Sequence, residues 1–552
     1  GLGDVYKRQK QTKLQMLLRG ANAVGYTSYP DNVVKEFIHL AAKNGVDVFR
    51  IFDSLNGLDN MRLSIDTVRE CNKVAEAALC YTGDILDPRR DKYDLKYYVD
   101  MAKELAAAGA NIIAIKDMAG LLKPEASYRL VSALKDAVDL PIHLHTHEGS
   151  GNAIYTYARA VDAGVDIVDT AMSAMSCGTS QPSGSSLYYA LSGHPRQPRV
   201  DVDAMNELSR YWETVRPYYK AADQTELFPN PEVYVHEMPG GQYTNLKQQA
   251  TALGLIERWE EVKDMYHRVS MMFGDLIKVT PSSKIVGDMA LFMVQNDLSE
   301  EDIYAKGDVL DFPASVVEFF EGRIGVPYQG FPQKLQQIVL KGRKPLEGRP
   351  GDTLPPVNFE EIKAKLAELE APITEEAVSS YCLYPKVFTD WVKRVHDFGD
   401  VSVLDTPTFF FGMKIGEEIK VEIEQGKMLV IKLVHIGEAN ADGIRTVSFE
   451  FNGLPREIDI KDRNVKATNI SRKKADKANQ GEIGATLSGS VVKVLVEKGQ
   501  AVTKGTPLVV TEAMKMETTI AAPISGIVAQ IHVTAGNRIE SGDCLLEIEL
   551  KA

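Results

Sequence analysis

The sequence predicts an α/β fold joined to an all-β domain: an incomplete TIM (β/α)8 barrel with a helical extension, then a small α+β region and a C-terminal β-sandwich. Three features predict this organisation. Short apolar segments alternate with amphipathic, helix-length segments up to residue 200, and the next part of the chain is mostly helical in pattern. The C-terminal segment contains a tandem repeat of short alternating strands. The first pattern is typical of a parallel sheet covered by helices.

The barrel prediction depends on six candidate strands that recur about thirty residues apart. They are LQMLLRG (14–20), VDVFRIFD (46–53), AALCYTGD (77–84), NIIAIKDM (111–118), PIHLHTH (141–147) and VDIVDTAMS (165–173). Barrel active sites lie at the C-terminal ends of the strands. Six charged or imidazole residues fall there: Arg50, Asp53, Lys116, Asp117, His145 and His147. A doubly wound open sheet is the alternative, but no glycine-rich phosphate loop supports it.

Six strands are two fewer than a closed barrel needs, and we expect the two missing strands before residue 14. The opening GLGDVYKRQ has no apolar periodicity. We therefore interpret residues 1–13 as a non-native leader and the chain as a fragment cut inside its first domain. Because an open barrel exposes strand edges, we expect this chain, expressed alone, to fold poorly and to be inactive.

Residues 14–200 form the predicted truncated barrel, and residues 201–345 form its helical extension. Within the extension, residues 236–250 and 278–290 have the Gly and Pro content of loops. The segment 341–356 is rich in Gly, Pro and charge and indicates a domain boundary.

Three further regions follow that boundary. Residues 346–470 combine predicted helices over 357–400 with alternating, strand-like residues over 406–462. Residues 471–484 are polar and predict a flexible linker. Residues 485–552 form the last domain.

Composition excludes several classes of function. The 552 residues are 44% hydrophobic and 25% charged, as in globular domains. The net charge of −13 argues against a nucleic-acid binder or a membrane-surface binder, and no apolar run is long enough to span a bilayer. Five scattered Cys without a CxxC pair predict reduced thiols and a cytoplasmic location.

The stretch PIHLHTHEGSG (141–151) places His143, His145 and His147 on alternate positions of a strand end. Alternate side chains of a strand point to the same face. His145 and His147 could therefore bind one metal ion, whereas His143 lies deeper and is as readily a core residue. For an isolated HxH pattern, solvated imidazoles are the commoner explanation, so the pattern alone leaves both readings open.

The C-terminal domain contains an internal repeat. SGSVVKVLVEKGQAVTKGTPL begins at Ser488 and SGIVAQIHVTAGNRIESGDCL begins at Ser525, so equivalent residues lie 37 positions apart. Matched glycines and alternating apolar residues predict two equivalent halves of one small β-sandwich. EAMKMET, with Lys515 at its centre, connects the halves, where we expect an exposed hairpin turn.

This motif and its symmetry resemble biotin carboxyl carrier domains, which are biotinyl/lipoyl-type β-sandwiches. The resemblance implies biotin in amide linkage on Lys515 and a biotin protein ligase as a partner. Met514 favours biotin over lipoate, because lipoyl domains usually have an acidic residue before the lysine. A tethered cofactor keeps its effective concentration high at two active sites.

The rest of the chain resembles the carboxyltransferase part of the pyruvate carboxylase family. The shared motifs are LLRGANAVGY, VFRIFDSLN, IKDMAGLLKP, HLHTH and TSQPS, and HEMPGGQYTNL and TPSSKIVGDMA extend the likeness. It covers nearly everything after residue 13. It implies a divalent metal ion, Mn or Zn, held by carbamylated Lys116, by His145 and His147, and by an Asp.

The resemblance implies roles for two more side chains. Arg50 would stabilise the pyruvate enolate, and Thr179 would relay a proton between pyruvate and biotin. From the residues alone, structural roles stay open: an Arg50–Asp53 pair, a Lys116–Asp117 pair at the barrel rim, and a loop cap at Thr179.

Three departures from the family pattern concern the site. The strand that carries the metal Asp, with a substrate Arg and Gln in a D-A-H-Q-S motif, is absent from this sequence. Glu148 stands where the family has Asp, which affects the hydrogen bonds around the metal ligands. Gly57 stands where many relatives have an aromatic residue of the biotin pocket.

Together the resemblances imply carboxyl transfer from carboxybiotin to pyruvate, giving oxaloacetate, within an ATP- and biotin-dependent ligase of anaplerosis and gluconeogenesis. ATP would act only in an N-terminal half outside this chain, and residues 400–470 would serve allosteric control and assembly of a homotetramer. Two alternatives remain: an oxaloacetate decarboxylase or transcarboxylase alpha-type subunit, and a non-catalytic biotin carrier and assembly fragment. An upstream ATP-binding domain would distinguish the carboxylase.

Overall fold

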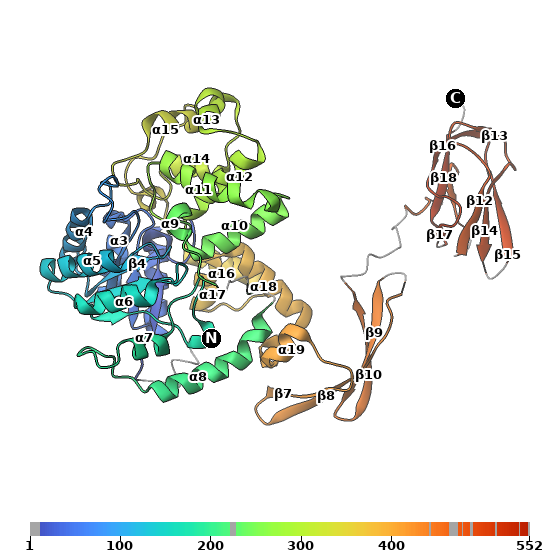
Figure 1. Cartoon of the computed structure of the whole chain (residues 1–552). Coiled ribbons are helices and arrows are strands. Elements are labelled where there is room, and N and C mark those ends of the chain that lie inside the picture. The colour runs from blue at the N-terminus through green and yellow to red at the C-terminus, as the bar shows by residue number, and fades with distance from the viewer. Residues whose placement is uncertain are drawn as a thin grey trace. The chain divides into compact units, whose positions relative to one another are not determined.

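The chain folds into two compact units, Gly1–Val401 and Ser402–Ala552 (Figure 1). The computed structural model describes residues 11–220, 223, 228–440, 443–462, 473–476, 479–485, 489–513, 516–539 and 541–549. None of the described helices combines the length and the hydropathy that crossing a bilayer requires.

A parallel sheet of six strands forms the centre of the first unit. Its strands are β1 (Gln15–Leu18), β2 (Val48–Ile51), β3 (Val74–Cys80), β4 (Ile112–Asp117), β5 (Ile142–Thr146) and β6 (Ile167–Val168). They pair in chain order, and among the described strands β1 and β6 each have one neighbour. A doubly wound sheet would reverse its strand order at a switch point. The sequential order therefore confirms the predicted incomplete barrel.

Two strand boundaries differ from prediction. Strand β3 spans Val74–Cys80 rather than 77–84. The predicted start was too late because the charged Glu76 looks unsuited to a buried strand. In the structure Glu76 is paired with Arg50 and His143. Strand β6 is only Ile167–Val168 rather than 165–173, and the backbone N–H of Asp169 makes one more bond to β5, with the carbonyl of Leu144 at 3.1 Å.

Five helices cover the outer face of the sheet (Figure 1). They are α2 (Asp31–Lys43), α3 (Leu58–Glu70), α4 (Leu95–Ala107), α5 (Pro124–Ala137) and α6 (Ala153–Asp162). Their apolar faces and the strands share one core, in which Phe49, Ile115, Leu144 and Tyr157 are fully buried. Burial on both faces explains why the strands are nearly continuous apolar runs.

The predicted helical extension is present and has a core of its own. Its helices, after α7 (Gly184–Ala190), are α8 (Val202–Val215), α9 (Val233–His236), α10 (Gly240–Ala252), α11 (Trp259–Met272), α12 (Ser282–Gln295), α13 (Glu300–Lys306), α14 (Ala314–Phe320) and α15 (Gln333–Leu340). The expectation that 236–250 and 278–290 are loops is wrong. Pro239 and Pro281 immediately precede α10 and α12, so these prolines mark helix starts.

The extension packs on loops that follow the barrel strands. Ser282 Oγ donates to the carbonyl of Ser54 at 3.4 Å, and Asn60 Nδ2 donates to the carbonyl of Ile324 at 3.5 Å. Because Ser54 follows β2 at its C-terminal end, the extension lies over the end of the barrel where active sites are built.

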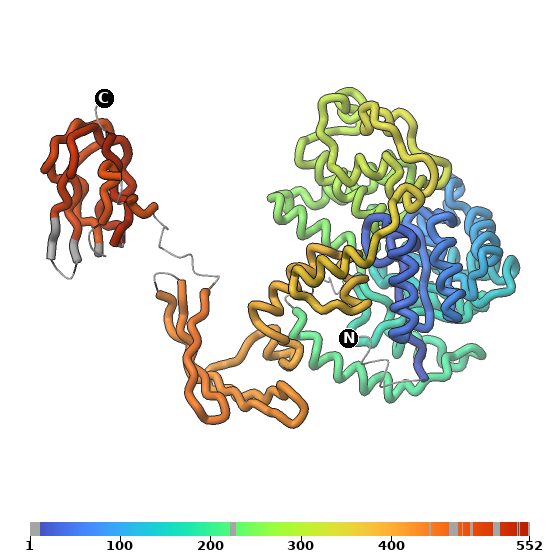
Figure 2. Tube along the Cα trace, turned by 180° about the vertical axis from the view of Figure 1, so that it is seen from behind, coloured from blue at the N-terminus to red at the C-terminus, as the bar shows by residue number. Residues whose placement is uncertain are grey.

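Three helices then return to the barrel (Figure 2): α16 (Phe359–Glu368), α17 (Glu375–Leu383) and α18 (Pro385–Phe398). They confirm the helices predicted over 357–400. Tyr29 Oη, just before α2, donates to the carbonyl of Leu383 in α17 at 2.7 Å, and Lys43 of α2 forms an ion pair with Glu375 of α17 at 2.5 Å. These contacts attach the linker helices to α2.

The second unit begins with α19 (Thr406–Phe411), so the prediction of strands from residue 406 is wrong at its start. Asp405 caps this helix through Thr408 N at 3.4 Å, and Gly412 ends it. An antiparallel sheet follows, in the order β10 (Leu454–Lys461), β9 (Ile444–Phe451), β8 (Lys427–Ile436), β7 (Glu418–Glu424).

The C-terminal domain is the predicted sandwich. One sheet is β11 (Glu482–Gly484), β18 (Cys544–Glu549), β16 (Gly526–Ile531) and β13 (Ala501–Val502); the other is β15 (Met516–Ala521), β14 (Pro507–Ala513), β12 (Gly489–Val494) and β17 (Arg538–Ile539). Strands β12, β13 and β14 start 37 residues before β16, β17 and β18, which is the offset of the sequence repeat. The repeated turn glycines Gly499 and Gly536 share φ values of 86° and 85°.

The predicted flexible linker 471–484 is wrong at its C-terminal end. Glu482–Gly484 form β11 on the edge of β18, and Ile483 is buried in the core of the sandwich. Backbone pairing with β18, the buried Ile483 and ion pairs of Lys473 and Lys474 therefore hold this polar segment to the domain. Residues 471, 472, 477 and 478 lie outside the described part of the chain.

Candidate active site

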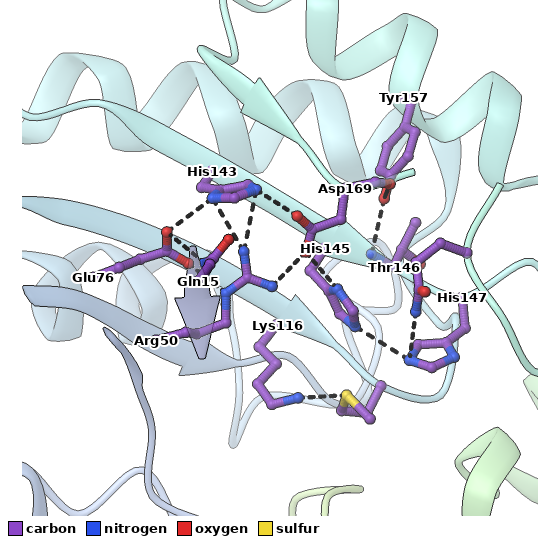
Figure 3. A network of polar contacts seen from close by, with 12 residues as sticks. Gln15, Arg50, Glu76, Lys116, His143, His145, Thr146, His147, Tyr157 and Asp169 are labelled. Carbon is purple, nitrogen blue, oxygen red and sulfur yellow. Dashed lines mark hydrogen bonds and ion pairs between the residues drawn. The ribbon is translucent and has the colours of Figure 1, made fainter. Parts of the chain in front are cut away.

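The barrel strands bring the predicted ligand residues together at their C-terminal ends (Figure 3). Lys116 lies near the end of β4 and pairs in register with His145 of β5. His147 follows β5 directly. All three side chains are largely buried: Lys116 is 2% exposed, His147 is 9% exposed, and the His145 side chain is 13% exposed.

The two histidines direct one ring nitrogen of each toward the other. His145 Nε2 lies 3.2 Å from His147 Nε2. His145 Nδ1 lies 2.7 Å from Asp169 Oδ2, and His147 Nδ1 lies 2.6 Å from the carbonyl oxygen of Thr179. A carboxylate and a carbonyl only accept hydrogen bonds, so both Nδ1 atoms donate. In neutral rings both Nε2 atoms then carry lone pairs.

The pKa values keep these rings neutral. Burial lowers the pKa of His145 to about 4 and that of His147 to about 3. Two facing lone pairs repel each other unless a positive charge lies between them or beside them. Gln181 Nε2 approaches His147 Nε2 only to 3.5 Å. The pair is therefore a preformed acceptor site for a cation, of the kind that imidazole ligands give to divalent metals.

A buried ionic network supports the pair from within the barrel (Figure 3). Asp169 contacts His145, and its other oxygen accepts from His143 Nε2 at 2.8 Å. Glu76 accepts from His143 Nδ1 at 2.9 Å, and Arg50 forms ion pairs with both Glu76 and Asp169. Burial lowers the pKa of His143, but hydrogen bonds to Asp169 and Glu76 outweigh this and raise it. The positive charges of a protonated His143 and of Arg50 balance the negative charges of Asp169 and Glu76.

This network settles the open question about His143, which is a support beneath the ligand pair. It also contains two residues that the sequence reading missed, Glu76 and Asp169. Asp169 stands at the C-terminal end of a strand as Asp53 and Asp117 do, which is a usable signal. Glu76 gave no signal, because it interrupts an apolar strand and its partners lie on other strands.

The expected contact of Arg50 with the substrate stays a prediction, and in this structure its guanidinium is engaged inside the barrel. Its Nε and Nη1 atoms are engaged by Glu76 and Asp169, and Nη2 lies 3.1 Å from the His143 ring. The residue is 5% exposed. Arg50 therefore orients Asp169 and, through it, His145.

Asp53 and Asp117 are not the partners of Arg50 and Lys116. Asp53 accepts from the backbone of Leu55 at 2.8 Å and of Gly57 at 2.9 Å. Asp117 Oδ1 accepts a hydrogen bond from Leu121 N at 2.9 Å. Its Oδ2 accepts hydrogen bonds from Leu122 N and from the hydroxyl of Thr146. Both carboxylates fix the loops that leave the strand ends.

Lys116 is a buried cation without a carboxylate partner among the described residues. Its Nζ contacts Met118 Sδ and lies 4.8 Å from the ring centre of Phe52. Burial lowers the pKa of Lys116 to about 8, so a sizeable fraction is unprotonated near neutral pH.

Arg19, at the end of β1, is a second cation of this kind, and the sequence reading missed it although LLRG stands at a strand end. Its Nη1 donates to the carbonyl of Val24 at 2.8 Å, its guanidinium lies 6.0 Å from the Phe52 ring centre, and its buried Nε has no partner. The charge of Arg19 contributes to the lowered pKa of Lys116, so the two are neighbours. With an unpartnered donor and no carboxylate partner among the described residues, Arg19 is a candidate to hold an anion.

Thr179 lies beside the histidine pair. Besides accepting from His147, it lines a pocket together with His147, and its side chain packs against Gly240, where a Cβ would come within 2.7 Å of Thr179 Cβ. The rest of the lining is mostly apolar or small (Ala119, Gly149, Gly178, Phe228, Val233, Met238, Gly240 and Tyr243), with Asn230, His236 and Thr244 as polar members. A second half-buried hydroxyl, Thr280, precedes the segment that contacts Ser54.

Glu148 supports the loop after β5. Its Oε1 accepts from Ala153 N, the first residue of α6, at 3.2 Å, and its backbone N–H donates to the carbonyl of Ser180 at 2.9 Å. Glu148 thus caps α6, where Asn152 makes no side-chain cap. Its buried Oε2 has no partner.

Lys515 lies outside the described residues, with Met514 before it. Strands β14 and β15 on either side are antiparallel neighbours, with Ala513 opposite Met516. The predicted hairpin between the repeat halves is therefore consistent with the strands that flank it.

Three segments of the chain match known families. Residues 59–211 match the HMGL-like family, residues 233–432 the conserved carboxylase domain, and residues 477–548 the family of biotin-requiring enzymes. The matched segments correspond to the barrel, the extension with its linker helices, and the sandwich.

Curated relatives extend this likeness to almost the whole chain. Pyruvate carboxylase of Bacillus subtilis is 58% identical over 549 residues, which are 99% of this chain and 48% of the relative. Mitochondrial pyruvate carboxylase of Rattus norvegicus is 48% identical over 97% of this chain and 46% of the relative. The chain spans about half the length of the curated relatives that it matches.

Solved structures agree. The carboxyl transferase domain from Rhizobium etli pyruvate carboxylase superposes with a TM-score of 0.81 and 51% identity, covering 84% of this chain and 78% of that chain. The complete multifunctional pyruvate carboxylase from Rhizobium etli gives a TM-score of 0.81 and 48% identity over 99% of this chain and 50% of that one.

Proposed function

This chain belongs to the pyruvate carboxylase family, and on that premise we propose that it transfers a carboxyl group from carboxybiotin to pyruvate, giving oxaloacetate. The observation that carries the proposal is the pair of Nε2 atoms of His145 and His147, 3.2 Å apart, beside the buried amine of Lys116 and near Arg19, whose buried Nε has no partner. This arrangement offers a metal site and an anion site side by side, which pyruvate needs for its carbonyl and its carboxylate.

The donor set suits a divalent ion such as Mn or Zn. His145 and His147 would supply two nitrogens, and Lys116 would supply an oxygen after its neutral amine adds CO₂ to form a carbamate. The lowered pKa of Lys116 favours that addition, and a carbamate would remove the positive charge that otherwise repels a metal. A bound divalent ion would act as a Lewis acid on the carbonyl oxygen of pyruvate.

The chain's own residues would do the rest. Arg19 would hold the carboxylate of pyruvate, in place of Arg50, which would keep Asp169 and His145 in position. Once the N–C bond of carboxybiotin has broken and released CO₂, Thr179 would accept a proton from the methyl group of pyruvate while it gives its hydroxyl proton to the ureido nitrogen. The resulting enolate would attack the CO₂ to form oxaloacetate. The apolar pocket beside Thr179 would exclude water from the enolate.

Biotin would be attached to Lys515 by a biotin protein ligase, since the sandwich matches biotin-requiring enzymes and Lys515 centres its AMKM motif. We propose that ATP is used by a part of the enzyme outside this chain. Residues 402–470 would serve regulation and the assembly of a homotetramer. The enzyme would work in the cytoplasm. The curated relatives named above are pyruvate carboxylases, and this favours carboxylation over an oxaloacetate decarboxylase subunit.

The test is a chimera in which this chain replaces the matching half of Bacillus subtilis pyruvate carboxylase. We expect ATP-dependent conversion of pyruvate to oxaloacetate. Lys515→Ala should abolish both streptavidin binding and turnover, whereas Lys116→Ala should abolish turnover and leave streptavidin binding intact. Carboxylation that survives Lys515→Ala would refute the carrier assignment.

The proton relay needs its own comparison. Thr179→Ala should lower kcat by about 100-fold or more, whereas Thr179→Ser should retain most of it. Thr280→Ala serves as the control, since it removes a half-buried hydroxyl that does not line the pocket beside Thr179. A larger loss for Thr280→Ala than for Thr179→Ala would transfer the relay role to Thr280.

A further inference from the structure

A cluster of metal-ligating side chains lies in the sandwich, where no role has been assigned to it. Ligand atoms of His532, Cys544 and Glu547 all lie within 4.8 Å of one another. His532 follows β16, and Cys544 and Glu547 belong to β18. The pairing of β16 with β18, Ile531 opposite Leu546, is what brings the three together.

These residues are the ligands that zinc prefers: an imidazole nitrogen, a thiolate and a carboxylate oxygen. Cys544 is fully buried, and among the described residues its thiol makes one hydrogen bond, a long one of 3.8 Å to the carbonyl of Leu546. The side chains of His532 and Glu547 are 24% and 30% exposed, so an ion can enter from their side. Three ligands leave the fourth position of a tetrahedral site to water.

The present contacts of Glu547 show what the ion must compete with. His532 Nε2 lies 3.1 Å from Glu547 Oε1, and Lys473 Nζ lies 2.9 Å from the same oxygen. Lys473 also binds Glu482 at 2.7 Å. Lys473 can therefore release Glu547 and still keep a carboxylate partner.

We propose that His532, Cys544 and Glu547 bind a zinc ion at the point where the linker enters the sandwich. Binding breaks the S–H bond of Cys544, releases that proton to solvent and forms a sulfur–zinc bond, with no change of oxidation state. The ion replaces the ammonium of Lys473 on Glu547. The site is independent of the function proposed for the barrel, because none of its ligands belongs to the first unit.

A cation bound at this site would affect the segment that leads into the sandwich. The backbone carbonyl of Lys473 accepts from Cys544 N at 2.7 Å, and β11 pairs Glu482 with Glu547. A ligand set on β16 and β18 therefore lies directly under the segment that leads into the sandwich. A bound ion would restrain β18 on the side that pairs with β11, and it would release the Lys473 ammonium from Glu547.

Cobalt(II) is the probe, because a cobalt–thiolate bond gives a charge-transfer absorption in the near ultraviolet. The full chain carrying His145→Ala and His147→Ala is titrated, so that the barrel histidines contribute nothing. We expect one equivalent of Co²⁺ with a thiolate band, displaced by Zn²⁺. Cys544→Ser should remove the band, and Cys177→Ser, which changes an exposed thiol, should keep it.

Two further variants guard against a folding defect at the buried Cys544. His532→Ala changes a half-buried residue and should weaken Co²⁺ binding by more than the 10–100-fold typical of losing a supporting residue. Lys473→Gln removes the competing ammonium and should tighten binding about fivefold or more. The proposal is overturned if no thiolate band forms in the parent, if the band survives Cys544→Ser, or if Lys473→Gln weakens binding.

Discussion

Asp169 Oδ2 accepts a hydrogen bond from His145 Nδ1 at 2.7 Å, and this contact determines which nitrogen of His145 faces His147. Asp169 is held in turn by Arg50 and His143. The orientation of the His145–His147 pair therefore depends on these supporting residues inside the barrel.

The Asp169→Asn variant should weaken divalent metal binding by about 10–100-fold, because an amide no longer enforces the Nδ1–H tautomer of His145. Calorimetric titration with Mn²⁺ or Zn²⁺ on the full chain measures this. Asp166→Asn is the matched control: Asp166 lies on the same segment but binds Lys135 near the surface, and its loss should leave the metal affinity unchanged. Equal affinities of Asp169→Asn and wild type would contradict the positioning role.

The barrel and the sandwich were predictable because their signals are local. Each strand carries its own apolar run, and the 37-residue repeat reappears in the start points of three strand pairs. Lys116, His145 and His147 were predictable for the same reason, since each marks a strand end in a motif.

The support around these ligands was not predictable, because it joins distant strands. Arg50 and Asp169 are 119 residues apart in sequence and meet only because β2 and β6 curl toward each other around the barrel interior. An Arg three residues before Asp53 suggested a local pair, whereas the folded sheet gives Arg50 two partners from other strands. Sequence spacing does not encode contacts across a curled sheet.

Arg19 and Arg50 should respond differently to the same conservative change. In the chimera, Arg19→Lys should raise the KM for pyruvate about tenfold or more, because Lys cannot donate in a fork to a carboxylate. Arg50→Lys should leave the KM nearly unchanged and weaken metal binding instead, through Asp169. Steady-state kinetics combined with metal titration separates the two, and a raised KM for Arg50→Lys alone would restore Arg50 to the substrate site.

Glu148 should matter as a helix cap, not as a charge. Glu148→Ala removes the acceptor for Ala153 N and should lower the stability of the barrel by about 1 kcal/mol. Glu148→Gln keeps an acceptor oxygen and should stay within about 0.5 kcal/mol of wild type. Chemical unfolding of the full chain, followed by hydrogen exchange of α6, reports the difference. Equal losses in both variants would show that the negative charge itself is required.

A buried charge cluster between the barrel and its extension predicts an acid-sensitive contact. Asp275 forms ion pairs with Lys278 at 2.6 Å and Arg90 at 2.8 Å, and Lys278 is 2% exposed. Burial raises the pKa of Asp275, but Lys278 and Arg90 more than offset this and lower it to about 2. A folded pKa below the unfolded value of about 3.9 stabilises the fold fully above that pH, and the gain is lost as the pH falls toward 2.

Asp275→Asn should therefore cost about 3 kcal/mol at pH 7, since it leaves two buried cations with one carboxylate fewer. The difference from wild type should stay constant down to about pH 5 and shrink between about pH 4 and pH 2. Asp100→Asn, which breaks an exposed pair with Lys96, should cost less than about 1 kcal/mol at every pH. Urea unfolding at a series of pH values measures all three proteins. A penalty for Asp275→Asn that stays the same at pH 7 and at pH 3 would mean that the carboxylate is not held ionised by Lys278 and Arg90.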